Sequence, residues 1–314
     1  MANSVNLSAL TQYTDQLSHK LIHDAVLEGD TLNSGVTLLT GMKGEQAIPY
    51  LTSNLVMQAG GCDADIAGSV AITQRTVKVL PISVKEKICP DDFDPYFLGM
   101  KQKAGSYNEE GPAEFQQVYT AKKLNDLKAN IDVLFWKGSL SGTYSSTYNQ
   151  IDGLLWQLEG TSATSSVIRA GATYSGAPTI NNVADIIDSM TLARPENILD
   201  KDDNTLFVPF AAYDLYVMHL MKTNNFHFTG DEQKHKGFQI PGRNVFIKPT
   251  KGLNGLNKML LTPASNIIWA TDLTDDSEHF KFVFDPITDN LYFKSKFKLG
   301  AQVYFPQHCV LYKG

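Results

Sequence analysis

The feature that most constrains the fold is a long apolar stripe in the middle of the sequence. Its residues recur at helical spacing: Phe115, Val118, Tyr119, Leu127, Ile131, Leu134 and Phe135. Acidic residues and Pro112 precede the stripe, and Lys137-Gly138 ends it with a basic last turn and a glycine. These signals predict a helix from Pro112 to Lys137, about 39 Å long at 1.5 Å per residue. Because it lacks the sustained heptads of a coiled coil, we expect a spine across which other elements lie.

Upstream of this helix, residues 47–90 alternate with the period of a β-strand. Two alternating runs flank the glycine-rich stretch AGGCDADIAG, which predicts a long two-stranded excursion with this stretch at its tip. The alternation changes phase near Leu80-Pro81, as a β-bulge would produce. Between Val70 and Ile88 four cations stand against Glu86 alone: Arg75, Lys78, Lys85 and Lys87. Such a basic ribbon is either a solvated edge that resists aggregation or a surface that docks on an acidic neighbour.

The N-terminal segment predicts an amphipathic helix that ends in a turn-rich stretch at Gly35. Its apolar residues share near-helical spacing: Leu7, Leu10, Tyr13, Leu17, Leu21 and Val26. A terminal helix of this kind covers the core of its own subunit or forms an arm that covers a neighbour's. The sequence leaves both interpretations open.

Downstream of the spine, helical and strand patterns alternate beyond the Ser/Thr/Gly-rich stretch TSATSSVIRAGATYSGAPT, which we interpret as the boundary of a second domain. Helices are predicted at 183–190 and 211–221, and strands at 206–208, 245–247, 259–261 and 267–269. The C-terminal part is strand-like, with alternating runs at 280–284 and 291–299 around the turn DPITDN and final strands near 303–305 and 310–312. In the second run, Lys294, Lys296 and Lys298 occupy the face opposite the apolar residues. The alternation indicates an α/β or α+β layer.

Composition excludes several classes of protein. With 43% hydrophobic residues and a net charge of −6, the chain does not resemble a disordered protein, and the negative charge argues against a general nucleic-acid binder. No stretch approaches 18 consecutive apolar residues and the N-terminus lacks a secretory pattern, so we predict neither a membrane span nor secretion. The cysteines, Cys62, Cys89 and Cys309, lie far apart without CxxC spacing, which argues against a disulfide framework and a structural zinc site.

No catalytic, cofactor-binding or metal-binding motif is recognisable in the sequence. Dinucleotide and phosphate-binding loops and HExxH are absent, and the stretch 138–142 (GSLSG) has leucine where a GxSxG motif needs its nucleophile. His308 and Cys309 are adjacent, and adjacent residues of a strand point to opposite faces, so we expect no thiol–imidazole pair. Acidic clusters lie in turn-like segments and are interpreted as solvated: Asp91-Asp92-Asp94, Asp202-Asp203 and Asp275-Asp276. We therefore predict that the protein is not an enzyme and needs no cofactor.

The order of elements resembles that of the major capsid protein of tailed bacteriophages, which has the Hong Kong 97-type fold. Three local stretches carry the resemblance: residues 151–155 (IDGLL) after the spine, 206–209 (LFVP) before the 211–221 helix, and 263–268 (PASNII) ahead of Asp272. The resemblance implies an α+β fold with an N-terminal arm (1–46), an extended β-loop (47–90), a peripheral domain containing the spine helix (91–169), an α/β axial domain (170–275) and return strands to the peripheral domain (276–314).

The function implied by the resemblance is self-assembly into pentamers and hexamers that form an icosahedral shell around phage DNA. Arg75, Lys78, Lys85 and Lys87 would then lie in subunit interfaces. Scaffolding, portal and decoration proteins would be further partners, DNA would be enclosed without sequence-specific binding, and the protein would reside in the virion after assembly in the host cytoplasm. Three alternatives remain: an encapsulin-type nanocompartment shell with a protein cargo, another virion protein such as a tail component, and a soluble α/β enzyme.

Overall fold

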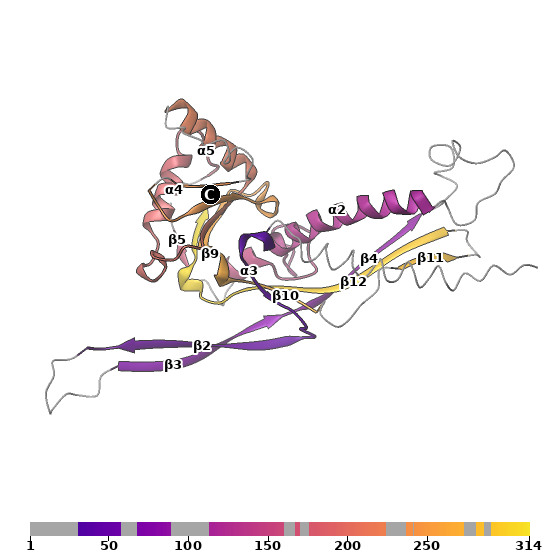
Figure 1. Ribbon diagram of the computed structural model, residues 1–314, viewed down its shortest axis with the longest axis horizontal. Helices are drawn as coiled ribbons and strands as arrows, with labels where there is room; N and C mark the ends of the chain where they lie inside the picture. Colours follow the sequence, from indigo (N-terminus) through magenta and orange to yellow (C-terminus); the bar gives the residue numbers. More distant parts are fainter. Residues whose placement is uncertain are drawn as a thin grey trace, which may run out of the picture.

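The computed structural model describes residues 31–57, 68–88, 113–159, 167–169, 176–223, 237–240, 242–272, 281–285 and 290–314. The predicted N-terminal helix and the acidic clusters at 91–94 and 275–276 lie outside these ranges. The described residues form helices, a five-stranded sheet, a six-stranded sheet and a two-stranded ribbon, which confirms the α+β class (Figure 1). No helix among these residues is long and apolar enough to span a membrane.

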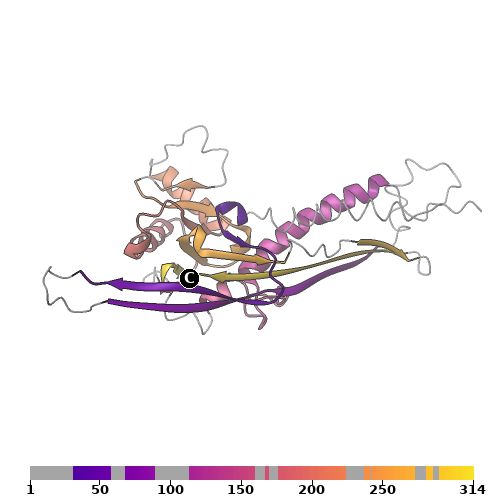
Figure 2. The same ribbon diagram turned by 60° about the horizontal axis from the view of Figure 1, so that its bottom comes forward.

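The predicted spine helix is present as α2 (Ala113–Lys137) and runs along the five-stranded sheet (Figures 1 and 2). The sheet has the order β1 (Thr37–Leu39), β10 (Ile267–Thr271), β12 (Asn290–Val303) and β11 (Lys281–Asp285), and β4 (Leu80–Ile88) also pairs with β12. The last turns of α2 are buried against this sheet, where the rings of Phe135 and Trp269 stack at 4.2 Å between centroids. The described part of the apolar stripe, Leu127, Ile131, Leu134 and Phe135, is therefore the contact between helix and sheet.

Two glycines allow the chain to turn back against the end of α2. The helix ends at Lys137 as predicted, but Gly138 does not adopt the left-handed conformation expected of a helix-terminating glycine. A Cβ on Gly138 would lie 2.5 Å from the carbonyl oxygen of Leu134, and a Cβ on Gly153 would lie 2.7 Å from the nitrogen of Gly138. The Gly153 N–H donates to the Gly138 carbonyl at 2.8 Å, which holds α3 (Leu154–Glu159) beside the spine. Close backbone approach therefore requires both glycines.

The second layer is a six-stranded sheet of order β5-β13-β9-β6-β8-β7, on which helices α4 (Val183–Leu192) and α5 (Phe210–Lys222) pack. Its strands are β5 (Ile168–Arg169), β6 (Asn204–Val208), β7 (Phe238–Gln239), β8 (Phe246–Pro249), β9 (Lys258–Pro263) and β13 (Val310–Lys313). Within β6, Leu206 and Val208 join the core under α4 and α5, whereas Phe207 joins the core around the spine helix. Both faces are covered, which explains why the central strands read as continuous apolar runs.

Strands of the two sheets alternate along the second half of the chain. β10 lies within the range assigned to the axial domain, but it pairs with β12 in the sheet under the spine. β13 lies within the range assigned to the return strands, but it pairs with β9 and β5 in the six-stranded sheet. The chain therefore passes from the six-stranded sheet to the five-stranded sheet after β9, and it returns to the six-stranded sheet after β12.

Candidate subunit-contact surface

A two-stranded ribbon projects from the body on the side opposite α2 (Figure 1). Strands β2 (Glu45–Leu55) and β3 (Gly68–Lys78) pair in antiparallel register over eleven residues each, about 37 Å at 3.4 Å per residue. The phase change predicted near Leu80-Pro81 coincides with the break between β3 and β4 at Val79. The ribbon therefore ends at Lys78, and β4 belongs to the sheet under the spine.

The base of the ribbon is fixed to the body. Val77 and Val79 are buried with Ile268 and Ala270 of β10 in a small core of their own. On the same side the ring of Tyr50 meets that of Phe305 edge to face, at 5.4 Å between centroids. The ribbon is thus held at its root and leaves the body in a defined direction.

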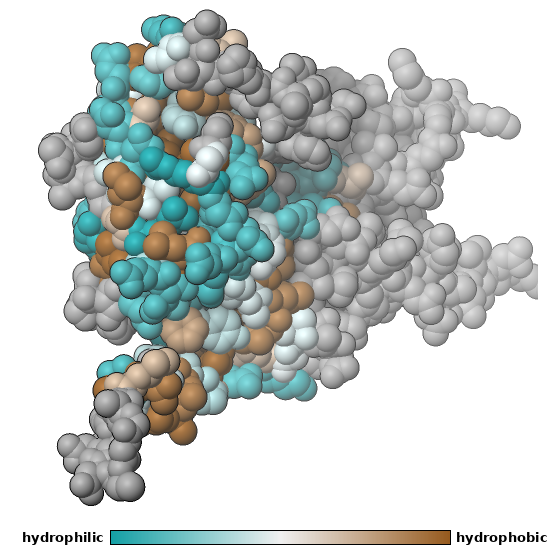
Figure 3. Space-filling model, turned by 60° about the vertical axis from the view of Figure 1, so that its left-hand side comes forward, coloured by the Kyte–Doolittle hydropathy of each residue, from teal (hydrophilic) through white to brown (hydrophobic). Residues whose placement is uncertain are grey.

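Towards its tip the ribbon exposes an apolar face. Leu51 lies directly opposite Ile72. Val70, two residues from Ile72, and Leu55, four residues from Leu51, lie on the same face. The exposed fractions are 60% for Leu51, 82% for Leu55, 71% for Val70 and 75% for Ile72. Apolar residues gather at this end of the molecule (Figure 3). We call these four residues the ribbon apolar face. Full burial of such a side chain is worth about 1.5–3 kcal/mol.

The sequence-based interface prediction did not include the ribbon apolar face. The sequence does carry its signal, because both strands of a two-stranded excursion place apolar residues on one face. Among the described residues, no third strand pairs with β2 or β3 to cover that face. That combination is unusual for a monomer, in which contiguous exposed apolar patches mark contact sites.

The four predicted interface cations are divided between two elements. Arg75 and Lys78 lie in β3, whereas Lys85 and Lys87 lie in β4 and thus outside the ribbon. Arg75 is half-buried near the ribbon base, and burial lowers the pKa of its guanidinium. Lys78 is exposed and pairs across the strands with Glu45, N to O 2.9 Å. A subunit-contact role for these four residues remains a prediction.

The other chemical candidates lie in structural settings. The Cys309 thiol is buried and contacts Thr262 Oγ1 at 3.6 Å, and the Asn266 amide donates to its sulfur at 3.4 Å. His308 closes a short 3₁₀ turn, where burial lowers the pKa of its imidazole. Asp203 accepts a hydrogen bond from the Ser265 N–H at 3.1 Å. Within the described ranges, no group of His, Cys, Asp and Glu side chains is arranged to hold a metal ion.

We expect Cys309 to resist aromatic disulfide reagents in the folded protein at about pH 8 and to react once the protein is unfolded. Burial raises the pKa of the thiol from 9.0 to about 12, so the folded state keeps the thiol proton where the unfolded state releases it. The same shift makes the free energy of unfolding fall as pH rises above 9. Labelling a variant with Cys62 and Cys89 changed to serine isolates the signal, and rapid labelling of the native protein would contradict the prediction.

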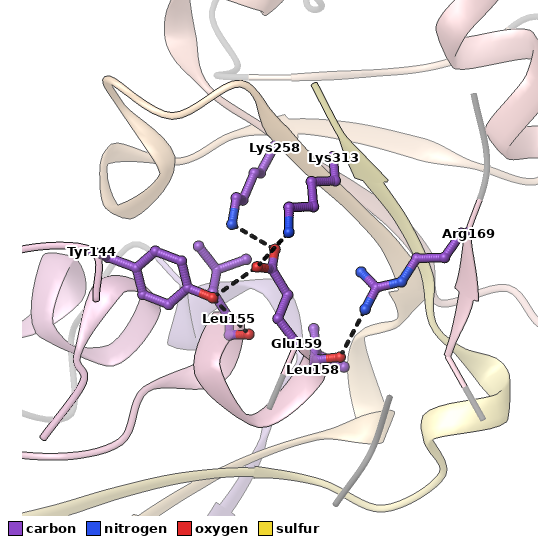
Figure 4. Close-up of polar contacts among 7 residues, drawn as sticks. All are labelled: Tyr144, Leu155, Leu158, Glu159, Arg169, Lys258 and Lys313. Carbon is purple, nitrogen blue, oxygen red and sulfur yellow. Dashed lines mark hydrogen bonds and ion pairs between the residues drawn. The ribbon is translucent and has the colours of Figure 1, made fainter. Parts of the chain in front are cut away.

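A partly buried ionic cluster joins the spine layer to the six-stranded sheet (Figure 4). Glu159, the last residue of α3, accepts hydrogen bonds from Lys258 Nζ at 2.5 Å and from the Tyr144 hydroxyl at 2.9 Å. Lys313 Nζ lies 3.8 Å from the same carboxylate, and the ammonium of Lys258 lies 4.4 Å above the centre of the Tyr144 ring. Burial lowers the pKa of Lys258, an effect that Glu159 partly offsets, and burial followed by the Glu159 charge raises the pKa of Tyr144. The cluster links α3 to β9 and β13.

Similar solved structures share this architecture over nearly the full chain. A chain of the satellite phage P4 procapsid with its size determination (Sid) protein is 14% identical, with a TM-score of 0.60, covering 94% of this chain and 90% of that chain. A chain of the capsid of Myoviridae phage XM1 is 12% identical, with a TM-score of 0.57, covering 90% of both chains. The chain has the Hong Kong 97-type capsid fold.

A virus-like particle is also among the similar solved structures. A chain of a virus-like particle from Pyrococcus furiosus is 10% identical, with a TM-score of 0.50, covering 94% of this chain and 96% of that chain. No protein-family model matches this sequence, and no curated protein matches it. The fold expected from the order of elements is therefore confirmed by structure, at sequence identities too low to carry a residue-by-residue comparison.

Proposed function

We propose that this chain is the major capsid protein of a tailed phage and assembles into a closed icosahedral shell. The observation that carries the proposal is the ribbon apolar face, presented on an arm that its own subunit leaves uncovered along the described strands. A capsid fold over at least 90% of the chain supports it, because the similar chains come from assembled capsids.

The ribbon is suited to a contact that repeats around a ring. Its root is fixed by a small core of its own, and the described strands β2 and β3 carry the ribbon apolar face away from the body (Figure 1). The surface that covers this face would then belong to another copy. Such a contact is heterologous, because it joins two different surfaces of neighbouring copies. It closes into a ring when a whole number of the rotations between copies adds up to one full turn. Pentamers and hexamers joined in this way form a closed shell, in which obligate interfaces exceed about 2,000 Å².

The finer assignments are parts of the same proposal. Each predicted segment would have a role within the shell: the arm, the extended loop, the peripheral domain, the axial domain and the return strands. The extended loop would correspond to the ribbon Glu45–Lys78. The shell protein would act structurally, without catalysis, in a virion that forms in the host cytoplasm. Scaffolding, portal and decoration proteins would be its partners besides itself.

Electron microscopy of the expressed and purified chain tests the proposal. We expect closed, regular particles together with capsomer-sized species on sedimentation. A compact monomer that persists at high protein concentration would reject shell formation and favour the soluble-enzyme alternative. Tubes or open rings would indicate another virion component, such as a tail protein.

A nanocompartment shell of the encapsulin type is the second candidate, favoured by the similarity to the Pyrococcus furiosus particle. The two candidates differ in cargo, since a phage head encloses DNA and a nanocompartment encloses protein. Particles isolated from the native source and treated with nuclease should retain protected DNA if the phage assignment is correct. Protected protein without DNA would favour the nanocompartment.

A further inference from the structure

A row of lysines covers one face of the sheet under the spine helix. In the antiparallel pairing of β4 with β12, Lys85 lies opposite Lys294, Lys87 opposite Tyr292, and Ser83 opposite Lys296. Since side chains alternate between the faces of a strand, this register places five lysines on one face: Lys85, Lys87, Lys294, Lys296 and Lys298. We call this surface the lysine face.

The opposite face of the same strands is the core. Ile82, Phe293 and Phe297 are buried there beneath α2, whereas Lys85, Lys87, Lys294 and Lys296 are exposed. Glu86 points to the α2 side and pairs with Lys123 of the helix, N to O 2.8 Å, so its charge does not neutralise the lysine face.

Lys298 is the member of the lysine face that has a carboxylate partner. Lys298 Nζ lies 3.6 Å from a carboxylate oxygen of buried Asp272 and donates to the Lys43 carbonyl at 3.3 Å. Among the described residues, no carboxylate lies within ion-pair distance of the remaining four ammonium groups. Like charges directly opposite each other on paired strands, as Lys85 and Lys294 are, destabilise a sheet. No carboxylate of the described residues offsets this repulsion, and an anionic partner would relieve it.

We propose that the lysine face binds carboxylates on a second copy of this chain and sets the register between neighbouring subunits. The inference rests on the proposed shell function, which supplies a neighbour in a fixed orientation. The chain carries −6 in total and the lysine face carries +5, so the rest of each copy carries −11. Among the described residues, the segment from α4 to β6 carries several exposed acids that could meet this face, including Asp185, Glu196 and Asp200.

The chemistry favours a protein carboxylate over a nucleic-acid phosphate. The lysine face contains no arginine, and its aromatic ring, Tyr292, is only partly exposed, so it offers neither bidentate phosphate contacts nor a stacking platform. The strongly negative remainder of the chain would repel a polyanion. Exposed lysines at a protein interface act mainly on encounter rate and orientation, while apolar residues such as the ribbon apolar face supply most of the affinity.

The test compares two variants that each lose four positive charges. The first carries K85Q, K87Q, K294Q and K296Q; the control carries K122Q, K201Q, K222Q and K251Q, at exposed lysines away from the lysine face. Assembly rate is followed by light scattering at about 0.1 M and about 1 M NaCl, where the Debye length falls from about 10 Å to about 3 Å. We expect the first variant to assemble about tenfold more slowly than the control at low salt and equally fast at high salt.

Zero-length carbodiimide cross-linking of wild-type particles identifies the partner. We expect Lys85 or Lys294 to be joined to an aspartate or glutamate of another copy. Equal assembly of both variants at both salt concentrations, or the absence of such intersubunit links, would overturn the inference. Unchanged assembly with loss of binding to a duplex DNA probe would assign the lysine face to nucleic acid instead. Thermal unfolding of both variants separates these outcomes from misfolding, and failure of the wild type to form particles would reject the proposed function itself.

Discussion

Replacing Leu51 and Ile72 together with aspartate is expected to abolish particle formation while leaving the subunit folded. The two side chains lie opposite each other on the ribbon apolar face and are mostly exposed, so the folded monomer loses little packing. In the assembled shell the same positions would be buried, and two desolvated carboxylates side by side would cost several kcal/mol at every copy of the contact. Sedimentation and electron microscopy measure assembly, and thermal unfolding measures the integrity of the subunit.

The opposite face of the ribbon provides a matched control. Asn54 and Ser69 also lie directly opposite each other, near the tip, and both are exposed. Changing both to aspartate introduces the same charges at the same cross-strand spacing without touching the ribbon apolar face. Particles that form normally from the Leu51→Asp/Ile72→Asp protein would show that this face is not the contact, whereas loss of particles in both variants would indicate a general effect of charge on the ribbon.

Replacing Glu159 with alanine is expected to lower the free energy of unfolding by about 3 kcal/mol. The side chains of Glu159 and Lys258 are only 11% and 12% exposed, so the change leaves the ammonium of Lys258 without its close counterion in a poorly solvated place. Lys313→Ala is the control: its side chain is 62% exposed and 3.8 Å from the carboxylate, so its loss should cost less than about 1 kcal/mol. Urea denaturation of the three proteins measures the differences.

The Glu159→Ala penalty should depend on pH in a defined direction. Burial already lowers the pKa of Lys258 below its ordinary 10.5, and removing Glu159 lowers it further. Between that lowered pKa and 10.5 the folded state of the variant binds fewer protons than the unfolded state, so its stability rises with pH. The penalty should therefore be largest near neutral pH and shrink towards about pH 10. A penalty that does not change with pH would show that Lys258 is not the group responsible.

Elements whose apolar pattern is local could be predicted from the sequence. The spine helix ends at Lys137 as predicted, and strand β6 and helix α5 occupy the predicted positions. Burial of one helix face produces apolar residues at helical spacing, and burial of both faces of a strand produces a continuous apolar run, so both patterns can be recognised in the sequence. The predicted phase change near Leu80-Pro81 likewise marks a real break between strands.

Pairings between distant strands could not be predicted in the same way. The sequence indicated a single excursion over 47–90, whereas β4 leaves it to pair with β12, some 200 residues later in the chain. Alternation shows which residues of a strand share a face, but it does not identify the strand that lies alongside. The four predicted interface cations were consequently grouped by their place in the sequence, and the structure brings Lys85 and Lys87 together with Lys294 and Lys296 instead.

The pairing of β1 with β10 also sets an order of events during synthesis. β1 emerges from the ribosome about 230 residues before its partner at Ile267–Thr271, an interval of about 10–45 s at 5–20 residues per second. The ribbon and its apolar face emerge in the same early interval, before the sheet that anchors them can exist. In a nascent chain the ribbon apolar face is therefore exposed before β10, the strand that anchors the ribbon, has been synthesised. We expect chaperone binding during translation to control the yield of subunits that can assemble.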